Sequence, residues 1–140
     1  MKFKTQNKVL AASSLILLLA SIGIGARKMQ KLGNGTWGGQ HIQFEISDGS
    51  VDIQYDCAHG TITGPLTVDR QGRFSWRGTY TRERGGPIRL GQRAQDQGVT
   101  YSGTLNGNTM QLTVRFENST LAPQTYTLAR DTVGRVRKCK

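Results

Sequence analysis

The chain has 140 residues with 18 Gly and 3 Pro, and its 19 Lys or Arg against 9 Asp or Glu give a formal net charge of +10. About 110 residues follow the first 26, which is the size of one domain and leaves little room for a second. Between Leu32 and Arg130 there are 9 Arg against 8 Asp or Glu, so most of the excess positive charge lies at the two ends. Specific nucleic-acid binding needs basic residues clustered on one face among aromatic side chains, and charged ends alone do not support it.

Residues 1–26 have the pattern of a secretory signal. Lys2, Lys4 and Lys8 precede an uncharged stretch, residues 9–26, that ends in small side chains. This order is typical of a signal peptide, expected here as a helix that is removed on export. The stretch is also just long enough to span a membrane. We therefore expect a periplasmic or extracellular protein. The alternative is an uncleaved N-terminal anchor, which would be its only contact with a membrane.

Cys57 and Cys139 are the two cysteines of the chain. In a small exported domain we expect them to form a disulfide, because oxidising compartments favour such bridges. Closing a loop of roughly 80 residues would contribute at most on the order of 4 kcal/mol in the chain-entropy description. The alternative is two free buried thiols, which the penultimate position of Cys139 makes less favourable.

Strands are predicted by apolar side chains at every second position. Residues 42–46 and 51–55 each alternate between apolar and polar side chains, so each has one buried and one wet face. Asp48-Gly49 between them is a strong signal for a two-residue hairpin turn, because both central residues of a type I′ turn need a positive φ. We therefore expect the two strands to pair antiparallel.

The middle of the chain is less regular. A weaker strand is predicted over residues 61–68, with a proline in its middle that demotes it to an edge or a bend. Residues 74–80 give the clearest aromatic strand. The polar segment 82–97 has no sustained period and is predicted to be a long loop, with room for a short strand around Ile88 and Leu90.

The last third of the chain contains the strongest predicted contact. Residues 101–105 and 110–116 alternate on either side of Asn106-Gly107, a second hairpin signal. Two further short strands are expected towards the end of the chain, at residues 126–128 and 134–139.

About eight strands and no helical period after the signal predict an all-β domain over residues 32–140. Tight turns between sequential strands favour a single antiparallel up-and-down barrel, because closure removes exposed strand edges. The alternative is a two-sheet sandwich. Bulky side chains expected to point inward would fill an eight-stranded interior: Ile42, Phe44, Ile53, Tyr55, Phe74, Trp76, Tyr80, Tyr101, Leu105, Met110, Leu112, Val114, Phe116, Tyr126 and Leu128.

Several short segments follow one another in the exported part, among them GTWGG at 35–39, DCAHGTI at 56–62, ERGGP at 83–87 and the terminal Cys139. In this order they resemble a group of small secreted bacterial proteins to which no activity is assigned. The resemblance implies a bacterial protein with paired cysteines and brings no site residues. The Gly-x-Trp segment at 35–37 is also similar to the start of lipocalin and avidin-like barrels, in which a tryptophan plugs one end.

Catalytic and metal sites are not expected. A hydrolytic triad would need His41 or His59 beside a nucleophile, and no nucleophile-turn motif surrounds a serine. The spacing of Asp56, Cys57 and His59 matches no standard zinc arrangement, and a disulfide would occupy Cys57. We therefore predict no metal and no cofactor.

Two sets of residues are candidates for binding. The first is a ligand pocket at one barrel mouth, although ordinary core packing explains the same aromatic residues: Trp37, Tyr55, Trp76, Tyr80 and Tyr101. The second is the long loop, where four arginines stand against Glu83 and Asp96 and suit an anionic partner: Arg82, Arg84, Arg89 and Arg93. A solvated loop without a partner explains them equally well.

Three functions follow from these features. The first is a non-enzymatic exported binding module that meets an envelope protein, a polymer or an anionic surface through residues 82–97 and the barrel rim. The second is a small-molecule carrier of the lipocalin or avidin kind. The third, an enzyme, would require a cleft that unites His59 with Asp56 and a hydroxyl group.

Overall fold

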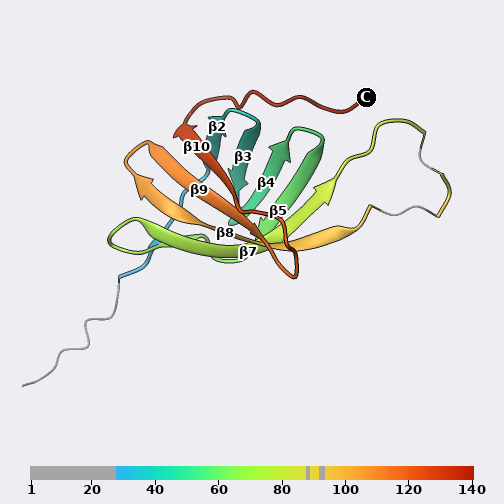
Figure 1. Ribbon diagram of the computed structural model, residues 1–140. Helices are drawn as coiled ribbons and strands as arrows, with labels where there is room; N and C mark the ends of the chain where they lie inside the picture. The colour runs from blue at the N-terminus through green and yellow to red at the C-terminus, as the bar shows by residue number, and fades with distance from the viewer. Residues whose placement is uncertain (1–27, 88, 92–93) are drawn as a thin grey trace, which may run out of the picture.

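Eight antiparallel strands close into a barrel in the computed structural model, which describes residues 28–87, 89–91 and 94–140 (Figure 1). The barrel order is β10-β2-β3-β4-β5-β7-β8-β9, so the strands follow in sequence and the last pairs with the first. This confirms the predicted barrel over the sandwich. The predicted signal segment, residues 1–26, lies outside the described residues. Among the residues that are described, no helix is long and apolar enough to cross a membrane.

The barrel strands are β2 (Gly35–Gly39), β3 (Ile42–Ser47), β4 (Ser50–Tyr55), β5 (Ala58–Thr63), β7 (Arg73–Arg82), β8 (Asp96–Asn106), β9 (Thr109–Phe116) and β10 (Gln124–Arg130). Two short strands, β1 (Gln30–Lys31) and β6 (Thr67–Val68), form a separate antiparallel pair.

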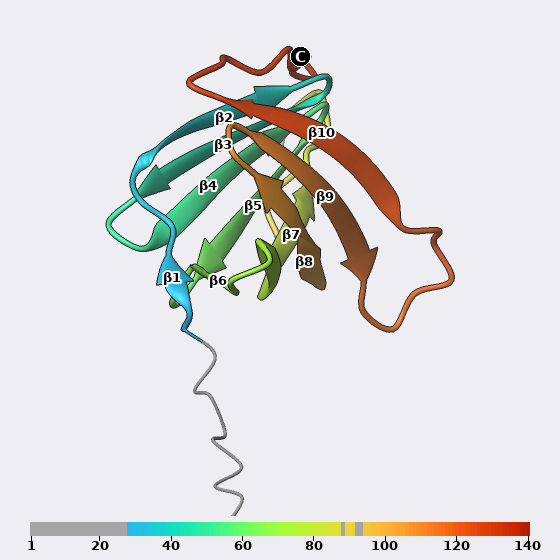
Figure 2. The same cartoon turned by 90° about the vertical axis from the view of Figure 1, so that its left-hand side faces the viewer.

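The barrel has two different ends. One end, here called the disulfide end, carries four connections, at residues 40–41, 56–57, 83–95 and 117–123. The other, the capped end, is covered by β1 and β6, which lie below the barrel in Figure 2. The amide of Leu32 donates to the carbonyl of Leu66 there at 2.8 Å, and both side chains are buried. The capped end is therefore closed by its own small sheet.

The two predicted hairpins form, with one difference in register. Asp48 and Gly49 have φ values of 49° and 83°, as a type I′ turn requires. In the second hairpin Asn106 stays in β8, and the two-residue turn is Gly107-Asn108, one position later than predicted. Only Gly107, with φ of 59°, is left-handed, which is the requirement of a turn with glycine at its first central position.

The predicted number of strands, eight, equals the number in the barrel, because two errors cancel. Residues 35–39 form β2, which was not predicted as a strand, because Gly38 on its outer face hides the alternation. A Cβ on Gly38 would lie 2.3 Å from the carbonyl oxygen of Thr132, so the C-terminal segment packs directly on this strand. The predicted last strand, residues 134–139, is not a strand and makes a single bridge from Arg135 to Gln40.

Other boundaries also move. The weak strand predicted over 61–68 is split into β5 and β6 around Pro65. The long loop is shorter than predicted and covers residues 83–95, because Arg82 ends β7 and Asp96 begins β8. Of the short strand predicted in this loop, Leu90 is not in a strand and Ile88 lies outside the described residues.

Side chains fill the barrel interior as predicted. Twelve of the fifteen expected inward residues are buried, and Tyr80, Leu105 and Tyr126 are partly buried against them. Polar side chains alternate with them on the outer wall. The interior is therefore a packed core, and the candidate sites lie towards the disulfide end.

Candidate functional site

All four tyrosines of the chain meet in the half of the barrel next to the disulfide end. The ring of Tyr55 lies 5.1 Å from that of Tyr80 and 5.9 Å from that of Tyr126, between centroids. The Tyr55 hydroxyl donates to the Tyr101 hydroxyl at 3.1 Å, and Tyr101 donates to the carbonyl of Thr79 at 2.8 Å. The rings and hydroxyls form one connected group, here called the tyrosine cluster.

Two glycines inside the strands make room for this cluster. A Cβ on Gly60 would lie 2.7 Å from the hydroxyl of Tyr101, and one on Gly78 would lie 2.8 Å from its ring. Glycine within a strand commonly marks such a close approach. The position of Tyr101 therefore depends on two residues that carry no side chain.

Burial makes three of the four tyrosines harder to ionise. It raises the pKa of Tyr55, and the neighbouring Tyr101 adds to the effect. Burial also raises the pKa of Tyr101, and it raises that of Tyr126 to about 12 with help from Tyr80 and Asp56. Each of these three hydroxyls already donates within the barrel: Tyr55 to Tyr101, Tyr101 to the carbonyl of Thr79, and Tyr126 to Oε1 of Gln124 at 2.7 Å.

The two tryptophans of the predicted pocket lie elsewhere. Trp76 stacks on Phe74 at 4.1 Å between ring centroids, and its Nε1 donates to the carbonyl of Thr67 in β6 at 3.0 Å. Trp37 is 1 % exposed and lies under the guanidinium of Arg130, 5.9 Å from the ring centroid. The structure thus brings Tyr55, Tyr80 and Tyr101 together, adds Tyr126, and places both tryptophans in other contacts.

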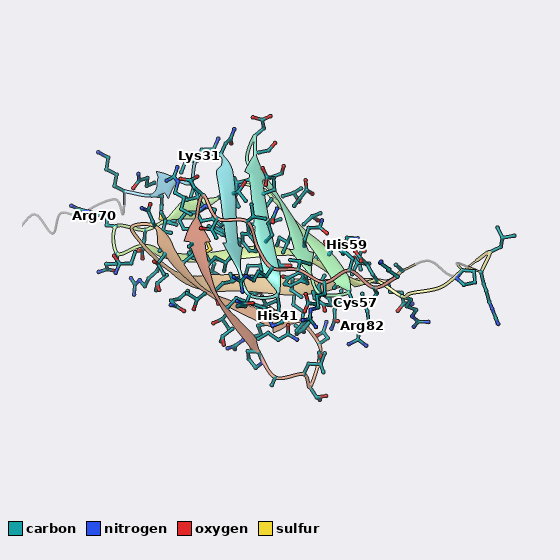
Figure 3. The ribbon with its side chains drawn as sticks, turned by 90° about the horizontal axis from the view of Figure 1, so that it is seen from above. Lys31, His41, Cys57, His59, Arg70 and Arg82 are labelled. Carbon is teal, nitrogen blue, oxygen red and sulfur yellow. A yellow bond between two sulfur atoms is a disulfide. The ribbon has the colours of Figure 1, made fainter. Side chains whose placement is uncertain are left out.

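The charged candidate site lies at the disulfide end. Figure 3 shows Cys57, His59 and Arg82 towards this end, and Lys31 and Arg70 towards the other. Residues 82–95 are here called the arginine loop. A depression of about 710 Å³ lies between it and the barrel, and its lining includes His59, Arg82, Glu83 and Arg84.

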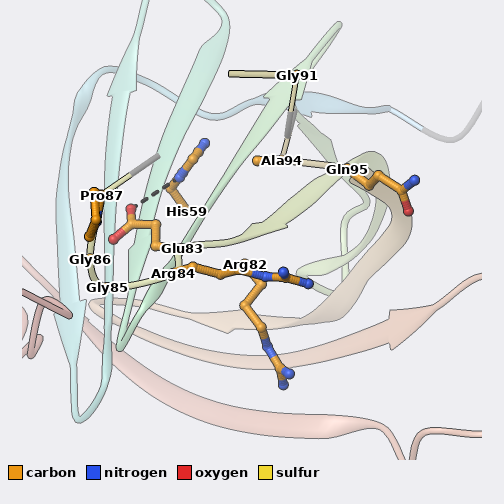
Figure 4. Close-up of a pocket in the computed structure, with 10 residues that line it drawn as sticks. All are labelled: His59, Arg82, Glu83, Arg84, Gly85, Gly86, Pro87, Gly91, Ala94 and Gln95. Carbon is orange, nitrogen blue, oxygen red and sulfur yellow. Dashed lines mark hydrogen bonds and ion pairs between the residues drawn. The ribbon is translucent and has the colours of Figure 1, made fainter. Parts of the chain in front are cut away.

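Side chains of the arginine loop point to opposite sides. In Figure 4 the carboxylate of Glu83 turns towards His59, while Arg82 and Arg84 extend away from it. Arg89 is exposed, and the fourth predicted arginine, Arg93, lies outside the described residues. The alternation along an extended chain therefore presents Arg82 and Arg84 together.

Arg82, Arg84 and Arg89 have no acidic partner among the described residues. All nine Asp and Glu residues are described, and no ion pair within the described ranges uses Arg82, Arg84 or Arg89. Asp96, the second acid predicted in the loop, instead accepts a hydrogen bond from Thr81 where β7 and β8 meet. The guanidinium groups are therefore available to a ligand.

The C-terminal residues 131–140, here called the strap, cross the disulfide end. In Figure 1 they run from the end of β10 over β2, β3 and β4. Asp56 accepts a hydrogen bond from the amide of Arg137 at 2.6 Å, and the amide of Cys57 donates to the carbonyl of Arg137 at 3.1 Å. The predicted disulfide between Cys57 and Cys139 forms, which is typical of proteins from oxidising compartments.

Glu83 ties the arginine loop to this arrangement. Its amide donates to the carbonyl of Cys57 at 2.8 Å. Its carboxylate accepts a hydrogen bond from Nζ of Lys138 at 3.0 Å and pairs with Nδ1 of His59 at 3.1 Å. Glu83, the second residue of the arginine loop, is thereby connected to the barrel wall, the disulfide turn and the strap.

The two carboxylates that hold the strap are stabilised in their charged form. The amide of Arg137 lowers the pKa of Asp56 against the opposing effect of burial, and His41, 2.5 Å away, lowers it further. Partial burial acts to raise the pKa of Glu83, but hydrogen bonds from Lys138 and His59 outweigh it and lower the value. Both groups therefore hold the strap as anions at neutral pH.

The union of His59 with Asp56, which the third function requires, is not formed among the described residues. His59 pairs with Glu83, whereas Asp56 pairs with His41. Within the described part of the chain no three His, Cys, Asp or Glu side chains are grouped so that they could hold a metal ion.

No protein-family model matches the chain, and comparisons with curated proteins and with solved structures find no similar protein. The resemblance to small secreted bacterial proteins therefore stays a prediction, and the functional argument rests on the arginine loop and the tyrosine cluster.

Proposed function

We propose that this protein is an exported, non-enzymatic binding module that holds an anionic partner of the bacterial envelope through the arginine loop and the rim of the disulfide end. The observation that carries the proposal is that Arg82 and Arg84 extend from the same side of the chain without an acidic partner. A guanidinium group is planar and donates two parallel hydrogen bonds to a carboxylate, phosphate or sulfate.

The anchored base of the loop supports this function. Glu83 lies between the two arginines and is held by His59 and Lys138. Restricting a binding segment before the ligand arrives lowers the entropy that is lost on binding. The backbone that carries Arg82 and Arg84 is therefore restricted before binding, while both side chains are exposed.

Two features support an exported location. The signal pattern of residues 1–26 and the disulfide at the strap favour a periplasmic or extracellular protein. Acidic polymers and acidic protein surfaces of the envelope are the partners of suitable charge in that location.

The test is calorimetric titration with dextran sulfate, with uncharged dextran as the blank. The variant R82Q/R84Q is expected to bind the sulfated polymer several-fold more weakly, because exposed charge pairs contribute roughly 0.2 to 1 kcal/mol each. The matched control K28Q/K31Q removes the same charge at the capped end and is expected to bind like the unchanged protein. Equal weakening in both variants would show a nonspecific charge effect and contradict the proposal.

A second candidate function, a small-molecule carrier, is favoured by one observation. Tyr80 and Tyr126 are only partly buried, and they lie beside the hydrogen-bonded pair of Tyr55 and Tyr101. A flat apolar molecule with a polar group could replace their mutual contacts, although the packed interior requires both rings to move. Native mass spectrometry of the protein from its own compartment tests this: a retained small molecule supports the carrier, and a bare chain speaks against it.

A further inference from the structure

The outer wall of β7, β8 and β9 carries a second set of arginines. Thr100 of β8 is the register partner of Arg77 on one side and of Arg115 on the other, so the three side chains form one row across the wall. Both arginines are exposed. The adjacent row, one pleat closer to the capped end, contains only hydroxyl side chains: Ser75, Ser102 and Thr113.

Acidic side chains flank these two rows. Asp69, next to the capped end, pairs with Arg73 at 2.9 Å, and the carboxylate of Glu117 lies over Gly98, one pleat from the arginine row towards the disulfide end. None of the ion pairs in the described ranges involves Arg77 or Arg115. The arginine row and the hydroxyl row themselves therefore contain no acidic side chain.

The opposite wall has the opposite charge. Glu45 and Asp52 are register partners on β3 and β4, and β2 to β5 contain no Lys or Arg. In the barrel order, β3 and β4 lie across the barrel from β8 and β9. A body with almost equal numbers of Arg and acidic residues thus has one cationic side.

The spacing of the arginines indicates the form of the ligand. Arg77 and Arg115 are two strand spacings apart, about 10 Å, and Arg82 follows Arg77 by about 17 Å along β7. Because side chains alternate along a strand, Arg82 leaves β7 on the face opposite to Arg77, at the rim of the disulfide end. A single phosphate, sulfate or carboxylate cannot contact all three positions. An extended chain that carries repeated charges can follow the outer wall and bend over the rim to contact them in turn.

We propose that the anionic partner is a linear acidic polysaccharide, which lies along the outer wall of β7 to β9 and reaches the arginine loop. Its charged groups meet Arg77, Arg115 and Arg82, and its neutral hydroxyls meet the Ser and Thr row. The proposal rests on the proposed function and names the ligand class for it.

A single-stranded nucleic acid fits this wall less well. Proteins bind such strands by stacking bases on exposed aromatic rings. The aromatic residues of these strands occupy the inward positions, and none stands on the outer wall: Phe74, Trp76, Tyr80, Tyr101 and Phe116. The wall therefore offers charge and hydroxyl groups but no stacking platform.

The experiment measures the affinity for sulfated oligosaccharides of two lengths, one much shorter than the roughly 30 Å from Arg73 to Arg82 and one longer. For the unchanged protein, binding of the longer chain is expected to be at least several-fold tighter. R77Q/R115Q is expected to lower the affinity for the longer oligosaccharide roughly threefold to tenfold and to leave the affinity for the shorter one unchanged. R82Q/R84Q is expected to lower the affinity for both oligosaccharides, and K28Q/K31Q is expected to change neither affinity.

The outcomes separate this inference from the proposed function. If R82Q/R84Q weakens binding while R77Q/R115Q changes nothing, the arginine loop keeps its proposed function. The inference that the polysaccharide lies along the outer wall of β7 to β9 is then wrong. If neither pair matters, both proposals fail. A single-stranded oligonucleotide of equal charge that binds as tightly, with the same sensitivity to R77Q/R115Q, would overturn the choice of a polysaccharide. Circular dichroism of each variant shows that the barrel is retained.

Discussion

Glu83 and Lys138 join the arginine loop to the strap, with 3.0 Å between the carboxylate and Nζ. Lys138 directly precedes Cys139, so the ion pair and the disulfide act at the same place. The arginine loop and the strap also touch at Gly85 and Lys140. A Cβ added to Gly85 would lie only 2.3 Å from the carbonyl oxygen of Lys140. Although 55 residues separate Glu83 from Lys138, the beginning of the loop and the end of the chain therefore depend on each other.

Removing the disulfide should loosen both segments. For the double variant C57S/C139S we expect a loss of unfolding free energy of up to about 4 kcal/mol, because the bridge restricts the unfolded chain. Urea unfolding measures this loss. Hydrogen exchange should become faster at the amides of Arg137 and Glu83, which bond across the disulfide turn, and stay slow in β8 and β9. Unchanged exchange at both amides would contradict the mutual dependence of the arginine loop and the strap.

Acid should also weaken the contacts by which Asp56 and Glu83 hold the strap. Asp56 and Glu83 have lowered pKa values in the folded protein, so each stabilises it above the ordinary carboxyl pKa of 3.8 or 4.5. This contribution is lost as the pH falls through the lower folded-state values. We expect D56N/E83Q to show a smaller loss of stability below about pH 4.5 than the unchanged protein, measured by thermal unfolding across pH.

The control for this comparison is Asp52→Asn on the outer wall of β4, where no ion pair is formed. It should follow the unchanged protein at every pH. If D56N/E83Q follows it too, the two carboxylates do not stabilise the fold.

The glycines beneath Tyr101 give a packing test. Gly60→Ala places a methyl group 2.4 Å from the carbonyl oxygen of Thr79 and 2.7 Å from the Tyr101 hydroxyl, and overpacking of this kind typically costs about 1 to 3 kcal/mol. Gly33→Ala is the matched control, because a Cβ there meets nothing within 4 Å. A chemical denaturation experiment should therefore separate the two variants. Equal stability would mean that both the Tyr101 side chain and the backbone at Thr79 can shift to make room.

Alkaline titration tests the tyrosine cluster. Ultraviolet difference spectroscopy should show Tyr126 ionising near pH 12, while Tyr55 and Tyr101 stay protonated until the protein unfolds. Because their pKa values are raised, their contribution to stability is present at neutral pH and is lost at high pH. Tyr126→Phe should remove the step near 12. Ionisation of all the tyrosines together near pH 10 would contradict the buried cluster.

The barrel could be predicted because the signals for its strands and turns lie in short segments of the sequence. Alternation along residues 42–46, 51–55 and 110–116 fixes which side chains face inward, and glycine-containing turns fix the pairing. The strand β2 was missed because its outer position, Gly38, is covered by the strap and needs no polar side chain.

The site could be predicted only in part. The arginine pattern marks the loop, but the contact of Asp56 with Arg137 joins residues 81 positions apart and leaves no periodic trace. The arginine row on the outer wall was also hidden, because Arg77 and Arg115 become neighbours only through the register of β8. Charge counted along the chain cannot show charge separated across a barrel.

The most direct measurement is a magnetic resonance titration of the isotope-labelled protein with a sulfated oligosaccharide longer than the β7 wall. Amide and guanidinium signals of Arg82 and Arg84 should move most, followed by those of Arg77 and Arg115, and the signals of Glu45 and Asp52 should stay in place. Changes confined to the capped end or to the wall of β3 and β4, or no change at Arg82 and Arg84, would contradict an anion-binding disulfide end.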